Sequence, residues 1–252
     1  MENLKDLLAL GETPRIAFVG SGGKTTALFK IATEYDSPVV VTATSHLEYY
    51  QTKHADQHFY WDDFQVGYIH LPEPIPGITL ISGPKNSRSV EGLGIEPLHK
   101  IVSLTDRFST PLLIESDGSR RHPLKAPAEH EPPIPDFVDT VVVTAGLSAL
   151  GQPCTSKWVH RPEIYSNLSG LQYGDLISLE AIKNVLGHPY GGLKNIPANA
   201  RKIALLNQAD TPELFEKAEI LANALLPKFD CIVVASLKNK HALHYQHVRL
   251  TK

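Results

Sequence analysis

The sequence is poor in cysteine and has no long apolar run. Its two cysteines, Cys154 and Cys231, lie far apart and do not have the spacing of a metal site or of a disulfide framework. A protein without disulfides is typical of the cytoplasm, where we expect this one. No stretch reaches the roughly 18 consecutive apolar residues of a membrane span. Residues 1–10 alternate charge and leucine without the apolar core of a secretion signal, so we expect no membrane partner.

A surplus of positive charge is also missing. The chain has 24 Lys and Arg against 27 Asp and Glu, which gives a net charge of -3. Proteins that bind nucleic acid usually gather positive charge, so we expect no nucleic-acid partner. The 42% of hydrophobic and 20% of charged residues are typical of a globular protein. The length suits one large domain over residues 1–252.

One stretch predicts a phosphate-binding loop. Four apolar residues, 16–19, are followed by Gly20-Ser21-Gly22-Gly23-Lys24-Thr25-Thr26 and then by a helical pattern. Strand, glycine turn and helix in this order are the layout of such a loop, in which backbone amides surround a phosphate at the positive end of the helix. Lys24 is expected to reach the outer phosphates, and the Thr25 hydroxyl to bind Mg²⁺. The predicted nucleotide-binding residues here are Gly20, Ser21, Gly22, Gly23, Lys24, Thr25 and Thr26. The alternative is a glycine-rich turn followed by Lys24 and Thr25 by chance.

The loop lacks the first glycine of the usual pattern, because Phe18 stands in its place. The shorter form resembles the loop of Mur-type ligases and related P-loop proteins. An ATP-dependent ligase or transferase is therefore an alternative function, and it would need a second substrate.

Two further predicted strands end in side chains that suit a metal ion. The apolar run 39–41 leads to Thr42-Ala43-Thr44, and the run 111–114 leads to Glu115-Ser116-Asp117-Gly118. The carboxyl ends of parallel strands meet on the ligand side of an open α/β sheet. We therefore predict that Mg²⁺ is bound by Thr25, Thr44, Glu115 and Asp117. Ordinary strand-end threonines and a turn-forming Asp-Gly pair are the alternative.

A group of cations follows the second of these strands: Arg120, Arg121, His122 and Lys125. Beside a phosphate site such residues can stabilise the charge that develops during phosphoryl transfer. Lys24, Asp117 and Arg120 are the predicted catalytic residues. A solvated charged face is the alternative interpretation. The proline-rich loop up to residue 135 is a candidate lid or switch.

Two motifs near the C-terminus favour guanine. Asn207-Gln208-Ala209-Asp210 follows a strand pattern, and Ser236-Leu237-Lys238 follows the next one, which we take as the last strand. GTPases carry Asn-Lys-x-Asp and Ser-Ala-Lys at such strand ends, and a carboxylate there accepts two hydrogen bonds that adenine cannot donate. Asn207, Asp210, Ser236 and Lys238 are therefore predicted to bind the base. Gln208 stands where GTPases have lysine, and a helix-capping Asp210 is the alternative.

The order of patterns predicts the fold class. Strands alternate with helices expected at 4–10, 24–35, 93–104 and 212–226, which is typical of an α/β protein with a P-loop NTPase-like, three-layer α/β/α fold and a mostly parallel sheet. Residues 147–197 are predicted to form a small helical insertion. The tail, with His241, His244 and His247, is expected to be an exposed terminal segment.

Several of these motifs recur together in one known family. They are the loop 20–26, Thr42-Ala43-Thr44, residues 115–120, Lys125-Ala126-Pro127, His160-Arg161-Pro162-Glu163 and residues 207–210. Over about residues 12–238 the chain resembles the selenium-dependent hydroxylase accessory protein family, YqeC. The resemblance implies a P-loop protein that assists the maturation of molybdenum hydroxylases that carry labile selenium. A client hydroxylase or another maturation factor is then an expected partner.

The residues and the resemblance leave three functions open. The first is an accessory protein that hydrolyses a nucleoside triphosphate, GTP or ATP, with Mg²⁺. The second is the ligase or transferase. The third is a nucleotide-dependent chaperone or cofactor carrier with little catalysis. Since many P-loop switches act as dimers, a homodimer is an alternative to a monomer.

Overall fold

The fold is known from a computed structural model, which describes residues 3–64 and 73–238 and the backbone of residues 245–248. The helices are α1 (Leu4–Leu7), α2 (Lys24–Ala32), α3 (Tyr49–Thr52), α4 (Ile95–Arg107), α5 (Pro162–Ser169), α6 (Leu179–Leu186) and α7 (Pro212–Leu225). The strands are β1 (Arg15–Gly20), β2 (Val39–Ala43), β3 (Leu47–Glu48), β4 (Gln57–Tyr60), β5 (Ile78–Ser82), β6 (Ser89–Val90), β7 (Leu112–Glu115), β8 (Leu124–Lys125), β9 (Thr140–Gly146), β10 (Val159–His160), β11 (Arg201–Asn207), β12 (Cys231–Val234) and β13 (Tyr245–Val248). Short 3₁₀ turns occur at Trp61–Phe64 and Leu147–Ala149.

A mostly parallel sheet forms the centre of the molecule. In the described part of the chain it has nine strands in the order β13-β12-β11-β9-β1-β7-β2-β5-β4, and β13 alone is antiparallel to its neighbour. Every residue of β2, β5, β7, β9 and β12 is buried. Strands buried on both faces read as continuous apolar runs, which is why the sequence reveals them.

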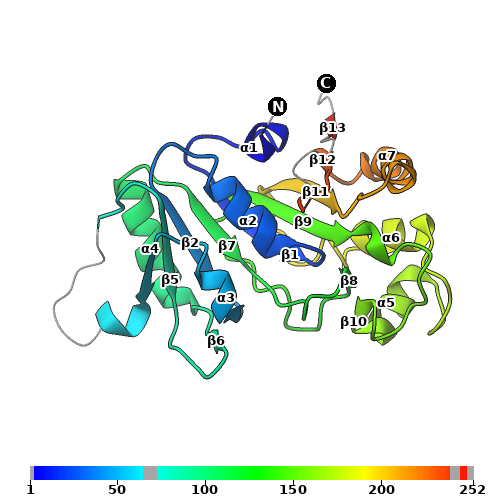
Figure 1. The fold of residues 1–252 in the computed structure, drawn as a ribbon, viewed down its shortest axis with the longest axis horizontal. Helices are drawn as coiled ribbons and strands as arrows, with labels where there is room; N and C mark the ends of the chain where they lie inside the picture. The colour runs from blue at the N-terminus through cyan, green and yellow to red at the C-terminus, as the bar shows by residue number, and fades with distance from the viewer. Residues whose placement is uncertain (1–2, 65–72, 239–244, 249–252) are drawn as a thin grey trace.

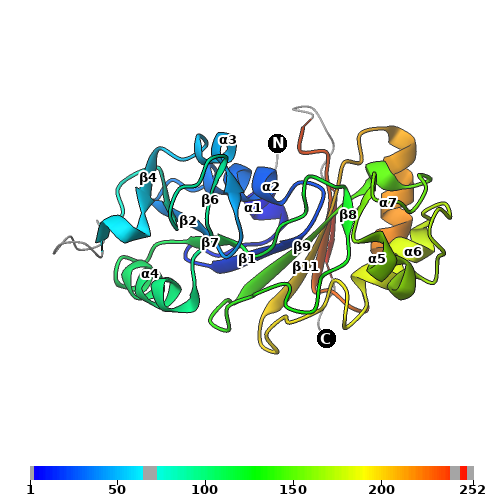
Figure 2. The ribbon, with the colours of Figure 1, turned by 90° about the horizontal axis from the view of Figure 1, so that it is seen from below.

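Helices cover both faces of the sheet, as Figures 1 and 2 show. Alternate residues of β1 face opposite ways: Ile16 and Phe18 pack with α1 and α2, whereas Ala17 and Val19 belong to the core beneath α4, α5, α6 and α7. The three-layer α/β/α architecture that the sequence predicts is therefore confirmed. No helix in the described residues is long and apolar enough to cross a membrane.

The predicted element boundaries shift in a few places. The first helix ends at Leu7 rather than residue 10, α2 ends at Ala32, and α4 spans Ile95–Arg107. Gly94 is extended and serves as the N-cap of α4, while the Leu93 amide donates to the Ala43 carbonyl oxygen and so belongs to the loop. The strand predicted before Ser236 is confirmed as β12, but the prediction that it is the last strand was wrong, because β13 adds an antiparallel edge strand beside it. His241 and His244 lie outside the described residues.

The connections place a ligand crevice at β1. From β1 the chain passes to β2, then to β4 at the edge and back to β5 between them, returns to β7, and then continues with β9, β11 and β12 on the other side. Open α/β sheets bind ligands at the carboxyl ends of the strands where the order reverses in this way. Here that point lies between the ends of β7, β1 and β9.

Candidate functional site

The glycines of the loop after β1 are required by its backbone. Gly20, Gly22 and Gly23 have φ values of 88°, 75° and 125°, in the region that other residues rarely adopt. Space is equally tight, since a Cβ atom on Gly20 would lie 2.2 Å from the Thr144 carbonyl oxygen and one on Gly22 would lie 2.3 Å from the Gly146 amide nitrogen. The loop therefore packs directly on the end of β9.

The loop presents unpaired amides at the start of α2. Gly23 is the N-cap residue and no side chain caps the helix. The backbone amides of Lys24, Thr25 and Thr26 donate no hydrogen bond within the described part of the chain. Free amides at the positive end of a helix attract an anion, and a phosphate suits this position.

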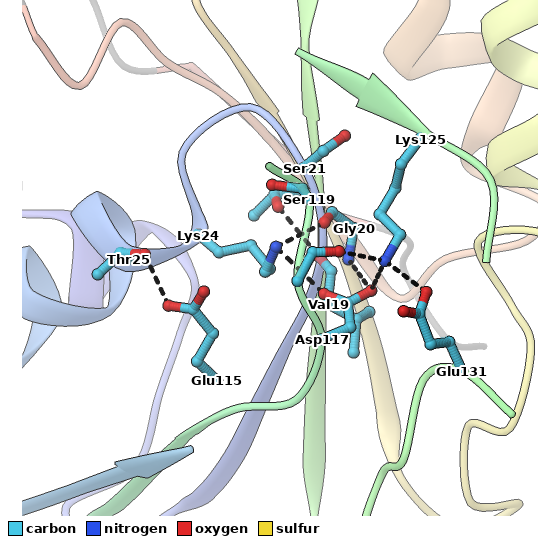
Figure 3. A network of polar contacts seen from close by, with 12 residues as sticks. Val19, Gly20, Ser21, Lys24, Thr25, Glu115, Asp117, Ser119, Lys125 and Glu131 are labelled. Atoms are coloured by element: carbon cyan, nitrogen blue, oxygen red, sulfur yellow. Dashed lines mark hydrogen bonds and ion pairs between the residues drawn. The ribbon is translucent and has the colours of Figure 1, made fainter. Parts of the chain in front are cut away.

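Lys24 is turned back from that position. Its ammonium donates to the Gly20 carbonyl oxygen at 2.7 Å and lies 3.1 Å from Oδ1 of Asp117. Only 2% of its side chain is exposed. Figure 3 shows Lys24 reaching Asp117 from one side while Thr25 and Glu115 meet separately. A phosphate at the start of α2 would have to compete with these two partners for the ammonium.

Thr25 and Glu115 come together as the sequence predicts for a metal site. The Thr25 hydroxyl donates to Glu115 Oε2 at 2.7 Å and accepts from Gln51 Nε2 at 2.8 Å. Burial raises the pKa of Glu115, while Lys24 and the Thr25 hydroxyl act to lower it. A hydroxyl and a carboxylate beside a phosphate position are the oxygen ligands that Mg²⁺ prefers.

The other predicted metal ligands are placed differently. Thr44 donates to the Pro133 carbonyl oxygen at 3.3 Å, and Asp117 is held between two lysines. No group of three or more His, Cys, Asp and Glu side chains that could hold a metal occurs among the described residues. A Mg²⁺ bound largely by phosphates and water needs only one or two protein ligands, so Thr25 and Glu115 fit that requirement.

Asp117 belongs to a row of alternating charges that begins at Lys24 and is buried in its first part. Its Oδ2 accepts from the Gly20 amide at 3.2 Å and from Lys125 Nζ at 2.8 Å. Lys125 also donates to Glu131 Oε2 at 2.9 Å, and Arg161 binds both oxygens of Glu131 at 2.7 and 2.8 Å. Burial raises the pKa of Glu131, but hydrogen bonds from Arg161 and Lys125 outweigh it and lower that pKa to about 2. Charges removed from water need such partners.

The neighbouring cations do not join this row. Arg120 and Arg121 both have left-handed backbone, with φ values of 48° and 62°, and are exposed. Arg121 pairs with Glu48 and lies over the Tyr50 ring, whereas the Arg120 side chain makes no hydrogen bond or ion pair with any described residue. His122 stacks on His160, whose pKa is lowered to about 4 by burial and by Arg161 and Lys125. The catalytic role predicted for Arg120 stays a prediction.

The predicted base-binding residues gather beside the loop. Asn207 donates to the Gly22 carbonyl oxygen at 2.6 Å and accepts from the Leu237 amide at 3.0 Å, so it ties the loop to the end of β12. The Ser236 hydroxyl donates to Asp210, which is exposed and open to a ligand. Lys238 is also exposed. Gln208 instead reaches Ser148 and the Gly22 carbonyl oxygen.

A small pocket that is partly open to solvent lies behind the loop. Its lining includes Gly20, Asp117 and Lys125 on one side and Tyr165, Ile182 and Val185 of α5 and α6 on the other. The Tyr165 hydroxyl is buried and has no hydrogen-bond partner among the described residues.

Sequence reasoning missed Gln51, Glu131 and Arg161. Gln51 gave no signal, because it lies in a segment without clear periodicity. Glu131 stands in the proline-rich loop, and Arg161 belongs to the motif His160-Arg161-Pro162-Glu163, which carried the family resemblance but suggested no role. Arg161 follows β10, which lies beside β8 and its Lys125, and this places Arg161 and Lys125 on the same carboxylate, that of Glu131.

Two comparisons with known proteins identify the same family. A family model described as YqeC protein matches residues 16–163, the part that holds the loop, Glu115, Asp117, Lys125 and Arg161. The chain is 32% identical over 206 residues to a protein of Escherichia coli (strain K12) described as "Uncharacterized protein YqeC", which covers 81% of this chain and 79% of that protein. No solved structure matches the chain significantly. The chain belongs to the YqeC family.

Proposed function

We propose that the protein binds a nucleoside triphosphate with Mg²⁺ at the loop 20–26 and hydrolyses it in the cytoplasm. The observation that carries the proposal is the group of unpaired amides at the start of α2, with Lys24 on one side and the Thr25–Glu115 pair on the other. The amides and Lys24 supply the charge that phosphates need, and Thr25 with Glu115 supplies oxygens for the metal. Catalysis by such a site is mainly positioning and charge stabilisation.

We propose GTP as the preferred nucleotide. Asp210 is exposed, and the Ser236 hydroxyl donates to one of its oxygens. Asn207, the last residue of β11, donates to the Gly22 carbonyl oxygen and so holds this strand end beside the loop. A carboxylate in that position can accept the two N–H groups of guanine, and adenine would leave it unpaired.

Calorimetric titration with GTP, GDP, ATP and ADP, with and without Mg²⁺, tests both proposals. We expect Lys24→Ala to lose triphosphate binding, and Asp210→Asn to lose roughly tenfold or more in affinity for GTP but not for ATP. Asp136→Asn removes an exposed carboxylate elsewhere and serves as the matched control. Binding of neither nucleotide by the wild type would overturn the first proposal, and equal binding of both would overturn the second.

We propose, further, that turnover serves the maturation of selenium-dependent molybdenum hydroxylases, as the family resemblance implies. The selenium content of a hydroxylase purified from cells that carry Lys24→Ala tests this role. We expect the content to fall, and an unchanged content would separate nucleotide turnover from maturation.

A ligase or transferase is the second candidate function, and the pocket behind the loop favours it. The pocket touches Gly20 and Asp117, so a second substrate there would lie beside the phosphate loop. Nucleotide turnover that depends strictly on an added acceptor would select this candidate, whereas turnover by the pure protein alone would favour simple hydrolysis.

A further inference from the structure

The Lys24 ammonium is bound by groups of the protein itself, and these contacts affect how tightly the proposed phosphate site can bind. The ammonium is almost completely buried between the Gly20 carbonyl oxygen and Asp117. A phosphate bound at the start of α2 would have to draw Lys24 away from that carboxylate. The affinity for phosphate therefore includes the cost of breaking a buried ion pair.

Asp117 has a second cation that can keep it neutralised. Lys125 Nζ donates to Asp117 Oδ2 at 2.8 Å, on the side opposite Lys24, and the Gly20 amide donates to the same oxygen at 3.2 Å. Figure 3 shows the two lysines approaching the carboxylate from opposite directions. Asp117 would therefore keep one full ion pair after Lys24 leaves, which avoids a buried unpaired charge.

The same lysine connects the loop to the helical segment 147–197. Lys125 is shared among Asp117, the Gly118 carbonyl oxygen and Glu131. Glu131 in turn binds Arg161, which is the N-cap residue of α5. When Lys24 leaves, Asp117 attracts Lys125 without competition, and the hold of Lys125 on Glu131 weakens.

We propose that Asp117 is a counter-ion that holds Lys24 back until phosphate binds, and that Lys125, Glu131 and Arg161 transmit the release of Lys24 to the start of α5. The proposal rests on the phosphate site proposed above. In the phosphate-free protein, Asp117 then acts on Lys24 and does not serve as a metal ligand. The segment that responds is the loop 126–135 together with the first turn of α5.

Two substitutions with opposite expected effects test the counter-ion. Inorganic tripolyphosphate in EDTA is the probe, because it reports on the phosphate site without base or metal. Asp117→Asn keeps the shape of the side chain but frees Lys24, so we expect roughly tenfold tighter binding. Lys125→Met removes the competing cation and leaves Asp117 to Lys24 alone, so we expect roughly tenfold weaker binding.

The outcomes separate this inference from the proposed function. If the wild type binds tripolyphosphate and Asp117→Asn binds it no more tightly, the counter-ion role of Asp117 is contradicted, whereas the proposed phosphate site is supported. If Asp117→Asn is weaker with Mg²⁺ and unchanged in EDTA, Asp117 is a metal ligand. If the wild type, Asp117→Asn and Lys125→Met all fail to bind tripolyphosphate, both proposals fail. Circular dichroism of each variant shows that it is folded, and the opposite sign expected of Lys125→Met keeps the test informative should Asp117→Asn unfold.

Hydrogen exchange tests the transmission step. We expect tripolyphosphate to change the exchange of amides in residues 126–131 and in the first turn of α5 in the wild type. Glu131→Gln should abolish the change at α5 without abolishing tripolyphosphate binding. Glu129→Gln, an exposed residue of the same loop, is the matched control and should respond like the wild type. An unaltered response in Glu131→Gln would overturn the transmission.

Discussion

At the scale of single residues, the buried Glu115 carboxylate lowers stability at a position where we propose a metal site. Its carboxyl group is buried, and burial raises its pKa although Lys24 and Thr25 oppose that shift. A raised pKa means that the ionised form costs stability in the metal-free protein: the contribution of Glu115 is favourable below its unfolded pKa and is lost as pH rises through the folded pKa. Bound Mg²⁺ would reverse this by favouring the ionised form.

Glu115→Gln should therefore stabilise the metal-free protein at alkaline pH. We expect its Tm near pH 8 to rise by about 2–4 °C, which corresponds to about 1 kcal/mol in a chain of this size, and the gain to vanish near pH 4. The variant should also lose the dependence of nucleotide affinity on Mg²⁺. Calorimetric melts at both pH values check the first effect and titrations check the second. A variant that is less stable than the wild type at alkaline pH would contradict the argument.

Gly23 tests whether the loop conformation is as constrained as its packing indicates. Its φ is 125°, and an added Cβ atom would lie 2.3 Å from Asn207 Nδ2, which is itself held by Gly22 and linked to Leu237. Gly23→Ala should cost about 2–3 kcal/mol in the free energy of unfolding. Gly11→Ala, where a Cβ meets nothing within 4 Å, should change it by less than about 0.5 kcal/mol. Urea unfolding of the two variants makes the comparison, and equal costs would count against a constrained loop.

At the scale of elements, the Glu131–Arg161 pair fixes the proline-rich loop to the start of α5. Hydrogen bonds from Arg161 and Lys125 overcome the effect of burial and lower the pKa of Glu131 to about 2. A lowered pKa makes a contribution that is present above the unfolded pKa, about 4.3, and is lost as pH falls toward 2.

Glu131→Gln should reproduce that loss at neutral pH. We expect it to lower the free energy of unfolding by about 2–3 kcal/mol near pH 7, and the difference from the wild type to shrink between about pH 4.5 and pH 2. Urea unfolding over this pH range measures the difference. Glu129→Gln should show no such dependence, and a gap that stays constant down to pH 2 would show that the pair does not carry the effect.

Some elements could be predicted from the sequence because buried strands appear in it as short apolar runs. β2, β7 and β9 are apolar runs that end in polar residues or glycine, and parallel strands covered on both faces require that pattern. The pairing of Thr25 with Glu115 followed from the rule that carboxyl strand ends meet at one edge.

Other features depend on contacts that composition does not reveal. Arg120, Arg121 and Lys125 look alike in the sequence, yet Lys125 is buried in β8 beside β10 while the two arginines are exposed. Asp117 and Glu131 lie only eight and six residues from Lys125, but Arg161, which pairs with Glu131, is 30 residues from it and is brought there by the fold. β13 was missed because Tyr245-Gln246-His247-Val248 is not an apolar run, and its pairing with the edge of β12 defines it.

At the scale of the whole molecule, the segment 147–197 shares a hydrophobic core with the sheet. Val19 and Val143 of the central strands belong to the same buried cluster as Tyr165, Ile182 and Val185 of α5 and α6. A shared core makes separate unfolding of the segment expensive, because it would expose the apolar face of the sheet. The chain should therefore unfold as one cooperative unit.

A single-tryptophan variant can test this cooperativity and its link to nucleotide. The chain has two tryptophans, so Trp61→Phe leaves Trp158, inside the segment 147–197, as the sole reporter. Trp158 fluorescence and far-ultraviolet circular dichroism should give one common urea midpoint. GTP at about 100 times its Kd should add about 2.7 kcal/mol and move both signals together. If Trp158 reports a transition at lower urea whose midpoint does not change with GTP, the segment 147–197 unfolds as an independent unit. The row of charges from Lys24 to Arg161 would then not couple the loop to α5.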